Sequence, residues 1–147
     1  MPRRRDPRAS APPTAVLDSE ALSVLANPTE RGAAARRAQA VLEAVERRSG
    51  SACVPAPVLA EVSRGSARRD TVARILNRLP VIPTDRIIAE RAGALLERDH
   101  LDSCHAVDAL VVATAIGLGR TVVLTADPQD LTQLASGFEG VAIQGLP

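Results

Sequence analysis

The sequence contains no lysine, no tryptophan and no tyrosine, and its one phenylalanine is Phe138. With so few aromatic rings, the chain does not match nucleic-acid-binding modules that stack bases on aromatic side chains. All 18 basic side chains are arginines, and 17 acidic residues offset them to a formal net charge of +1. This balance excludes a strongly basic, histone-like protein, although local arginine patches remain compatible with it.

The missing lysine excludes several classes of phosphate-handling protein. P-loop enzymes require the lysine of their glycine-rich loop. Two-component receiver domains and haloacid-dehalogenase-like phosphatases carry acids at strand ends, but both rely on a lysine. Dinucleotide-binding domains place Gly-x-Gly-x-x-Gly after the first strand, where this chain has Asp18-Ser-Glu-Ala-Leu22. Phosphate chemistry in this chain must therefore rest on arginine or on a bound cation.

Cysteine and long apolar runs are also scarce. Cys53 and Cys104 have no spacing typical of a zinc site, and no second cluster supplies further ligands beside Cys104 and His105. We expect both to be reduced, mostly buried thiols of a cytoplasmic protein. No window approaches the roughly 18 apolar residues of a membrane span. Residues 1–13 are expected to form a flexible basic arm before a single domain at 14–147.

From Thr14 onward, short apolar runs alternate with amphipathic stretches. This alternation predicts βαβ units and a parallel sheet that helices cover on both faces. Ser19 is expected to cap the first helix and Asp127 the last. In such sheets, ligands bind beyond the carboxyl ends of the strands, where Asp18 and Asp127 lie. The expected strands are 14–18, 52–55, 81–82, 120–125 and 141–143, and the expected helices are 19–27, 33–48, 57–64, 67–78, 85–99, 103–118 and 128–136.

Asp108 lies in a stretch from Ala106 to Gly119 that is apolar on almost every side, which predicts a helix buried all round. A carboxylate there costs several kcal/mol unless it is protonated, paired or bound to a cation. His105 precedes Asp108 by one turn on the same helix face. A buried pair of His105 and Asp108 that orients the helix is therefore one interpretation, and a cation ligand is the other.

Further acids lie beside apolar stretches. Glu61 flanks the apolar stripe of its helix, Asp18 ends the first strand, and Asp127 and Asp130 begin the last helix. Each has a structural interpretation: a solvated helix residue for Glu61, an N-cap for Asp18, and a cap resembling a capping box for the last two. Carboxylates that converge on one pocket repel one another, so together they indicate a site for Mg²⁺ or Mn²⁺ rather than zinc. Such a site can serve phosphodiester hydrolysis.

Several segments carry these acids in a fixed order. They are Val16-Leu-Asp-Ser-Glu-Ala-Leu22, Pro57-Val-Leu-Ala-Glu-Val62, His105-Ala-Val-Asp-Ala-Leu-Val-Val-Ala-Thr-Ala115 and Val123-Leu-Thr-Ala-Asp-Pro-Gln-Asp-Leu131. Their order and spacing resemble those of PIN-domain proteins, and most closely the VapC-type ribonuclease toxins of bacterial toxin–antitoxin pairs. The resemblance covers about residues 14–145 and so nearly the whole expected domain.

The resemblance implies an α/β protein, a three-layer α/β/α sandwich with a five-stranded parallel sheet. It also implies an Mg²⁺- or Mn²⁺-dependent endoribonuclease that cuts structured RNA such as tRNA or ribosomal RNA. A cognate VapB-like antitoxin would silence it, and a homodimer is expected. The alternatives are a PIN-type nuclease in RNA maturation and a non-catalytic binding module with the same fold.

Carried over by position, the resemblance makes Asp18 and Asp108 the principal metal ligands. Glu61 and Asp127 would complete the acidic cluster, with Thr125 and Asp130 as supporting residues. Glu20 departs from the family pattern, because many relatives carry a small polar residue there. The alanine-rich early helices are candidates for a groove that binds an antitoxin helix. Arginines near Glu61 are candidates for bidentate contacts to RNA phosphates: Arg64, Arg68 and Arg69.

Overall fold

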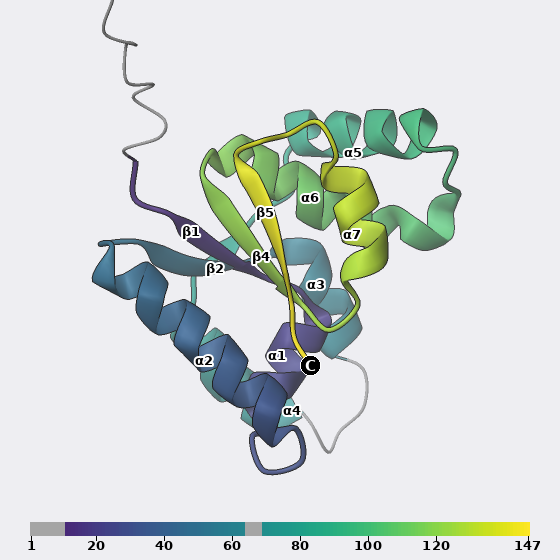
Figure 1. Cartoon of the computed structure of the whole chain (residues 1–147). Helices are drawn as coiled ribbons and strands as arrows, with labels where there is room; N and C mark the ends of the chain where they lie inside the picture. Colours follow the sequence, from purple (N-terminus) through teal and green to yellow (C-terminus); the bar gives the residue numbers. More distant parts are fainter. Residues whose placement is uncertain (1–10, 64–68) are drawn as a thin grey trace, which may run out of the picture.

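The computed structural model describes residues 11–63 and 69–147, and Figure 1 shows the arrangement of the chain. Most of the expected N-terminal arm, residues 1–10, lies outside the described residues. Within the described ranges, no helix has the length and apolar character needed to cross a membrane.

A five-stranded parallel sheet forms the centre of the molecule, as the family resemblance implied, in the order β3-β2-β1-β4-β5. Val16 of β1 pairs with Cys53 of β2 on one side and with Val123 of β4 on the other. Because the chain moves outward from β1 to β3 and then returns to β4, the strand order reverses between β1 and β4. In open α/β sheets this reversal leaves a crevice at the carboxyl ends of the two strands. The strands are β1 (Thr14–Leu17), β2 (Ser51–Pro55), β3 (Val81–Ile82), β4 (Thr121–Thr125) and β5 (Val141–Gly145).

Helices cover both faces of the sheet, which confirms the predicted layers. Figure 1 shows α1, α2 and α4 on one side, and α5, α6 and α7 on the other. The helices are α1 (Ser19–Ala26), α2 (Gly32–Arg47), α3 (Ala56–Val62), α4 (Arg69–Leu76), α5 (Arg86–Arg98), α6 (Ala106–Leu118) and α7 (Pro128–Ala135), with a short 3₁₀ turn η2 (Ser103–His105) before α6.

Most element bounds agree with the sequence prediction to within a few residues, and the differences come from caps. Asp18, not Ser19, is the N-cap of α1, because its side chain accepts a hydrogen bond from Ala21. Asp102 likewise caps the turn η2, which precedes α6 as a separate 3₁₀ segment. The cap of α1 therefore lies one residue earlier than predicted, whereas the helical segment that begins at Ser103 starts where the sequence placed it.

The core is built from small and branched aliphatic side chains instead of aromatic rings. Its largest fully buried side chains include Leu17, Leu22, Leu124, Leu131 and Leu134. Ala, Val and Leu side chains of α1, α6 and the central strands pack together in this core. Phe138, the one aromatic residue, lies at the edge of this core and is only partly buried.

Two expectations about burial were wrong. Cys53 is buried in β2, where burial raises the pKa of its thiol to about 11, but Cys104 is exposed. Helix α6 is buried along its middle, from Val111 to Ala115, but not all round. Gly117 and Leu118 are exposed at its end, and Asp108 in its first turn is half-buried.

Arg98, the last residue of α5, shows why arginine serves where lysine would not. Its guanidinium donates hydrogen bonds to the carbonyl oxygens of Ser136 (2.8 Å), Gln133 (3.1 Å) and Leu134 (3.1 Å). It also pairs with Asp99, which raises the pKa of Arg98 and lowers that of Asp99. A planar fork of donors can bind several acceptors at once, so one side chain ties the end of α5 to the end of α7.

Candidate functional site

A cavity of about 380 Å³ lies at the carboxyl ends of β1 and β4, at the point where the strand order reverses. The acids that the sequence marked all reach it, although they come from four different elements. Its lining is Asp18, Ser19, Glu20, Glu61, Asp108, Thr125, Ala126, Asp127 and Asp130. The fold therefore brings the carboxylates to one pocket, as the sequence predicted, and Glu20 also lines this pocket.

Asp18 is the most buried of these acids, with 7% of its surface exposed. Its Oδ1 accepts a hydrogen bond of 2.8 Å from the N–H of Ala21, so it does act as the N-cap of α1. The pKa of Asp18 is raised to about 6, mainly by burial and to a smaller extent by the nearby charges of Glu20 and Asp108, while hydrogen bonds from Thr125 and Ala21 oppose the rise. The Asp18 side chain therefore both caps α1 and lines the acidic cavity.

Thr125 ends β4 with its side chain almost fully buried beside Asp18. Its hydroxyl oxygen accepts a hydrogen bond of 3.0 Å from the N–H of Asp127. The same hydroxyl donates to the Asp18 carboxylate, which lowers the pKa of Asp18. Because a hydroxyl has one donor and can accept as well, Thr125 fixes Asp18 and the start of α7 relative to each other.

Asp108 projects into the cavity from the first turn of α6. Its pKa is raised, mainly by burial and then by the negative charges of Glu61 and Asp130. His105 opposes this rise, so the two residues do interact electrostatically as the spacing suggested. The nearest ion-pair partner of His105, however, is Asp130, with Nδ1 and Oδ2 separated by 3.4 Å. The interpretation of a closed, buried pair of His105 and Asp108 is therefore wrong.

Asp127 and Glu61 complete the lining from α7 and α3. Asp127 occupies the N-cap position of α7, but its side chain makes no capping hydrogen bond. The expected capping box is therefore absent, and the Thr125 hydroxyl binds the N–H of Asp127 instead. Glu61 is exposed at the cavity rim, where its charge contributes to the raised pKa of Asp108. Both carboxylates remain available to a ligand in the cavity.

His105 is the residue near this site that the sequence did not assign to it. Its imidazole, Asp108 and Asp130 each offer a ligand atom, and these atoms lie within 4.8 Å of one another. The signal in the sequence was the one-turn spacing of His105 and Asp108. The third member, Asp130, comes from α7, and only the packing of α6 against α7 brings it close.

The structure does not describe the side chains of the arginines that were predicted to bind RNA. Arg64 and Arg68 lie outside the described residues, and Arg69 begins α4 with a side chain that also lies outside them. Among the described residues that line the cavity there is no arginine. The charge of the carboxylates is therefore not balanced by a basic side chain in that lining.

The donor set of the cavity fits a hard divalent cation. Clustered carboxylates with raised pKa values are stabilised when a cation takes up their charge. Asp18 is buried and Asp108 half-buried in this lining, and the negative charge of Asp108 raises the pKa of Asp18. Oxygen ligands from carboxylates are typical of Mg²⁺ or Mn²⁺ and not of zinc.

The fold and this cavity define an α/β protein with an acidic site at the carboxyl edge of a parallel sheet. Residues 15–136 match the family model of the PIN domain. Because this match spans most of the chain, the protein belongs to the PIN domain family. No curated protein is similar enough in sequence to add to this comparison.

Solved structures that share the fold include the following three. VapBC2 from Rickettsia felis, bound to a DNA fragment from its promoter, is 16% identical, with a TM-score of 0.68 over 91% of this chain and 99% of that one. A toxin–antitoxin complex from Klebsiella pneumoniae is 24% identical, with a TM-score of 0.61 over 87% and 95% of the two chains. VapBC-1 from nontypeable Haemophilus influenzae is 15% identical, with a TM-score of 0.61 over 90% and 97%. At these identities, the similarity concerns the fold alone.

Proposed function

We propose that the protein is an Mg²⁺- or Mn²⁺-dependent endoribonuclease that hydrolyses RNA phosphodiester bonds as the VapC-type toxin of a toxin–antitoxin pair. The observation that carries the proposal is the convergence of carboxylates from separate elements on one cavity at the reversal of strand order. An acidic cavity repels a phosphate backbone on its own, so it can hold RNA only when a cation offsets its charge.

In this proposal Asp18 and Asp108 hold the cation directly. Glu61 and Asp127 take part from the rim, through water or a second ion, and Asp130 supports them. Thr125 keeps the Asp18 carboxylate in place through its hydroxyl. A bound divalent cation supplies the activation of a water molecule and the stabilisation of the leaving oxygen in phosphodiester hydrolysis. Arg64, Arg68 and Arg69 follow Glu61 in the sequence and are the proposed contacts to RNA phosphates.

The substrate class follows from the composition as well as from the family. With one aromatic residue in the chain, stacking of bases on aromatic rings is not available as a means of recognition. Recognition through backbone charge and RNA shape suits a structured RNA of the tRNA or ribosomal RNA class. We therefore propose such an RNA as the substrate. We also propose that the protein acts in the cytoplasm.

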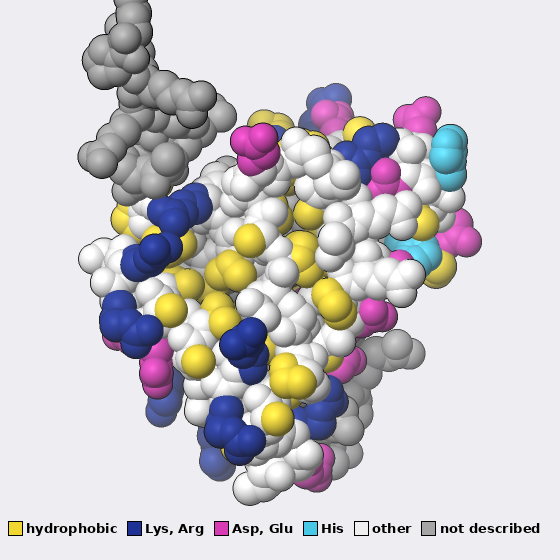
Figure 2. All heavy atoms as spheres, in the orientation of Figure 1, with side chains coloured by type: hydrophobic (Ala, Val, Ile, Leu, Met, Phe, Trp, Pro, Cys, Tyr) yellow, Lys and Arg dark blue, Asp and Glu magenta, His cyan; other side chains and the backbone are white. Residues whose placement is uncertain are grey.

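A VapB-like antitoxin is the proposed partner, because the solved structures that share the fold include two VapBC proteins and a toxin–antitoxin complex. The surface offers a groove for it. A hollow of about 690 Å³ lies between α2 and the C-terminal residues, lined by Ala33, Arg36, Arg37, Ala40, Gly145, Leu146 and Pro147. Figure 2 shows arginine side chains around small apolar patches on this face. Such a surface suits an acidic amphipathic helix, and a homodimer remains part of the proposal.

The direct test of catalysis is cleavage of a structured RNA by the purified protein. We expect cleavage with added Mg²⁺ or Mn²⁺, none with EDTA, and a loss of at least about a hundredfold in Asp18→Asn and in Asp108→Asn. Asp70→Asn is the matched control, because Asp70 is exposed on α4 and does not line the cavity. RNA binding without cleavage under any metal would replace the proposal with a non-catalytic binding module.

The toxin role has a separate test in cells. Induced expression of the wild-type protein should stop growth, whereas the folded Asp18→Asn variant should not. Sequencing of the 5′ ends of cellular RNA after induction would then locate the cut. Cleavage of RNA by the purified protein without any effect on growth would retain the nuclease and favour a role in RNA maturation instead.

A further inference from the structure

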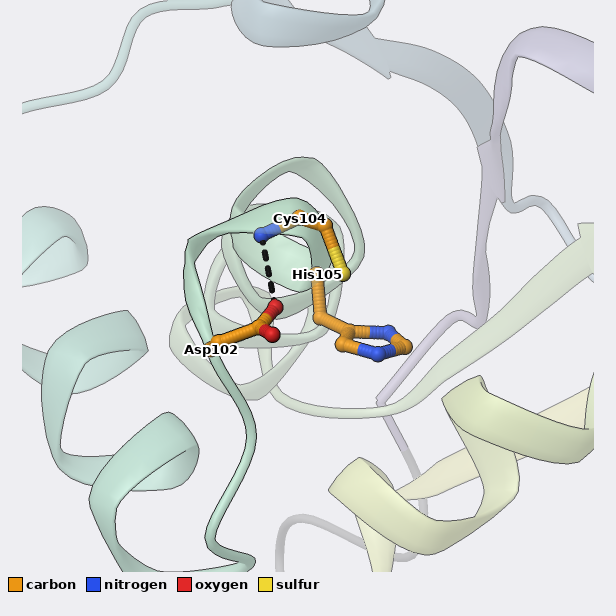
Figure 3. Close-up of side chains that lie close together, drawn as sticks. All are labelled: Asp102, Cys104 and His105. Atoms are coloured by element: carbon orange, nitrogen blue, oxygen red, sulfur yellow. Dashed lines mark hydrogen bonds between the residues drawn. The ribbon is translucent and has the colours of Figure 1, made fainter.

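A second group of ligand atoms lies on the rim of the acidic cavity, in the turn η2 that leads into α6. Asp102, Cys104 and His105 each offer one ligand atom, and the three atoms lie within 4.8 Å of one another. Figure 3 shows the three side chains close together on the turn: the Asp102 carboxylate faces the Cys104 N–H, and the His105 ring extends away from that carboxylate. Asp102 and Cys104 are exposed and His105 is half-buried, so an ion from solvent can reach all three.

The turn holds these side chains in place before any ion binds. Asp102 is the N-cap of η2, and its Oδ1 accepts a hydrogen bond of 3.0 Å from the N–H of Cys104. The Asp102 carboxylate also raises the pKa of the Cys104 thiol, because the two groups lie close together. A metal ion that binds a thiolate replaces the thiol proton. The turn therefore holds a carboxylate, a thiol and an imidazole close together before any ion binds.

The chemistry of this group differs from that of the acidic cavity. The cavity offers carboxylate oxygens, which suit Mg²⁺ or Mn²⁺, whereas the turn adds sulfur and imidazole nitrogen. Thiolate and imidazole ligands favour zinc, and three protein ligands that leave one position open are a common zinc arrangement. The sequence showed only Cys104 and His105 side by side; the fold of the turn adds Asp102 as the third ligand. The structure thus places a third possible ligand atom beside the pair that the sequence showed.

We propose that Asp102, Cys104 and His105 form a Zn²⁺ site on the rim of the acidic cavity, with an open fourth position. His105 links this site to the cavity, because its Nδ1 lies 3.4 Å from Asp130 and its ring also lies close to Asp108. A zinc ion held by His105 would compete with Asp130 for the same imidazole. The ligand set of this site does not include Asp18, Glu61 or Asp108.

The test uses binding alone, so its outcome does not depend on the proposed nuclease. The reduced, metal-free protein is titrated with Co²⁺, which reports a thiolate ligand through a charge-transfer band in the near ultraviolet. Zn²⁺ should then abolish the band, and competition with a chromophoric chelator gives the affinity for Zn²⁺. Asp18→Asn should bind Zn²⁺ with unchanged affinity, because it alters the cavity and not the turn.

Variants of the two cysteines make the test specific. Cys104→Ser should lose the Co²⁺ band and bind Zn²⁺ at least about tenfold more weakly, as the loss of a ligand or its support typically costs. Cys53→Ala is the matched control, because Cys53 is buried in β2 and should leave both readouts unchanged. His105→Gln should weaken Zn²⁺ binding as Cys104→Ser does. Circular dichroism confirms that each variant is folded.

Two results would overturn the zinc site. One is the absence of a thiolate band in the wild-type protein. The other is Zn²⁺ binding that survives Cys104→Ser but is lost in Asp108→Asn, because this pattern places the ion in the acidic cavity. If the site binds Zn²⁺ as proposed but the protein never cleaves RNA, the zinc site stands and the proposed nuclease falls.

Discussion

At the scale of single residues, the carboxylate of Asp18 serves two roles. It must cap α1 through the N–H of Ala21, and in the proposed function it must also hold a cation. Capping requires only an acceptor oxygen, which a neutral side chain can provide. The negative charge of a buried carboxylate is costly in the metal-free protein and useful only when a cation binds. The two roles can therefore be separated by substitution.

Asp18→Asn should keep the cap and remove the charge. In the absence of metal at neutral pH, its free energy of unfolding should exceed that of the wild type, because an uncharged side chain replaces a buried anion. Asp18→Ala should be less stable than Asp18→Asn by about 1 kcal/mol, because the N–H of Ala21 loses its acceptor. Urea unfolding of the two variants measures this difference. Equal stability of the two variants would show that the cap contributes nothing.

The raised pKa of Asp18 also predicts how stability changes with pH. The pKa is about 6 in the folded protein against 3.8 for an unperturbed aspartate, so between these values the folded state holds a proton that the unfolded state has released. The contribution of Asp18 is therefore fully present below about pH 4 and is lost as pH rises through about 6, by roughly 3 kcal/mol. Urea unfolding from pH 4 to 7, compared with Asp18→Asn, isolates this loss. A difference between the two proteins that does not change with pH would contradict it.

Thr125 is the residue whose hydroxyl holds the site together. Thr125→Val keeps the shape but removes the acceptor for the Asp127 N–H and the donor to Asp18. We expect a loss of about 1–3 kcal/mol in the free energy of unfolding and a higher pKa for Asp18. Thr125→Ser keeps the hydroxyl and is the control, with a smaller loss from the missing methyl group. Urea unfolding and titration of Asp18 by NMR measure both effects; a pKa unchanged by Thr125→Val would contradict this role.

At the scale of elements, the sequence predicted types and order well because each element carries its own periodic signal. The β-branched run of β4 and the proline and acid before α7 are local features, and the structure confirms both elements. The N-cap residues were harder to predict. Asp18 and Ser19 are both good N-cap residues, and the backbone conformation decides which of them caps α1. The start of the next helical segment at Ser103 was predicted, but its division into the 3₁₀ turn η2 and the helix α6 was not.

The junction between α2 and β2 depends on a close approach of backbone segments. A Cβ atom added at Gly50 would lie 2.9 Å from the carbonyl oxygen of Val45 and would also collide with the carbonyl oxygen of Pro13. Gly50→Ala should therefore destabilise the protein by roughly 1–3 kcal/mol, because the start of β1 or the end of α2 must shift. Thermal unfolding gives the size of the effect.

Gly93 provides the opposite case within a helix. It lies exposed in α5, and among the described residues no atom lies within 4 Å of an added Cβ. Gly93→Ala should raise the free energy of unfolding by about 0.5–1 kcal/mol, because alanine loses less backbone freedom in a helix than glycine does. If Gly50→Ala and Gly93→Ala both raised the free energy of unfolding, the collision expected at Gly50 would be contradicted.

At the scale of the whole molecule, the site follows from topology more than from any one motif. The reversal of strand order between β1 and β4 brings Asp18 and Thr125 together, and the packing of α3, α6 and α7 adds the remaining acids. The acids could be predicted because carboxylates are unusual at strand ends and in apolar helices. The pairing of His105 with Asp130 and the exposure of Cys104 could not, because both depend on how α7 and η2 pack after folding.

The acidic cavity predicts that the stability of the whole protein depends on divalent cations. A cation that binds only the folded state adds about 2.7 kcal/mol to the free energy of unfolding when its concentration is a hundred times its dissociation constant. Mg²⁺ or Mn²⁺ should therefore raise the unfolding temperature of the wild type. The increase should grow from pH 5 to 7, because the carboxyl of Asp18, with its pKa of about 6, loses its proton in that range. Asp18→Asn and Asp108→Asn should show a much smaller shift, while Asp70→Asn, outside the cavity, should behave as the wild type. An equal shift in all of these variants would mean that the cation binds elsewhere, and the carboxylates at the end of β1 and in α6 would then need another explanation.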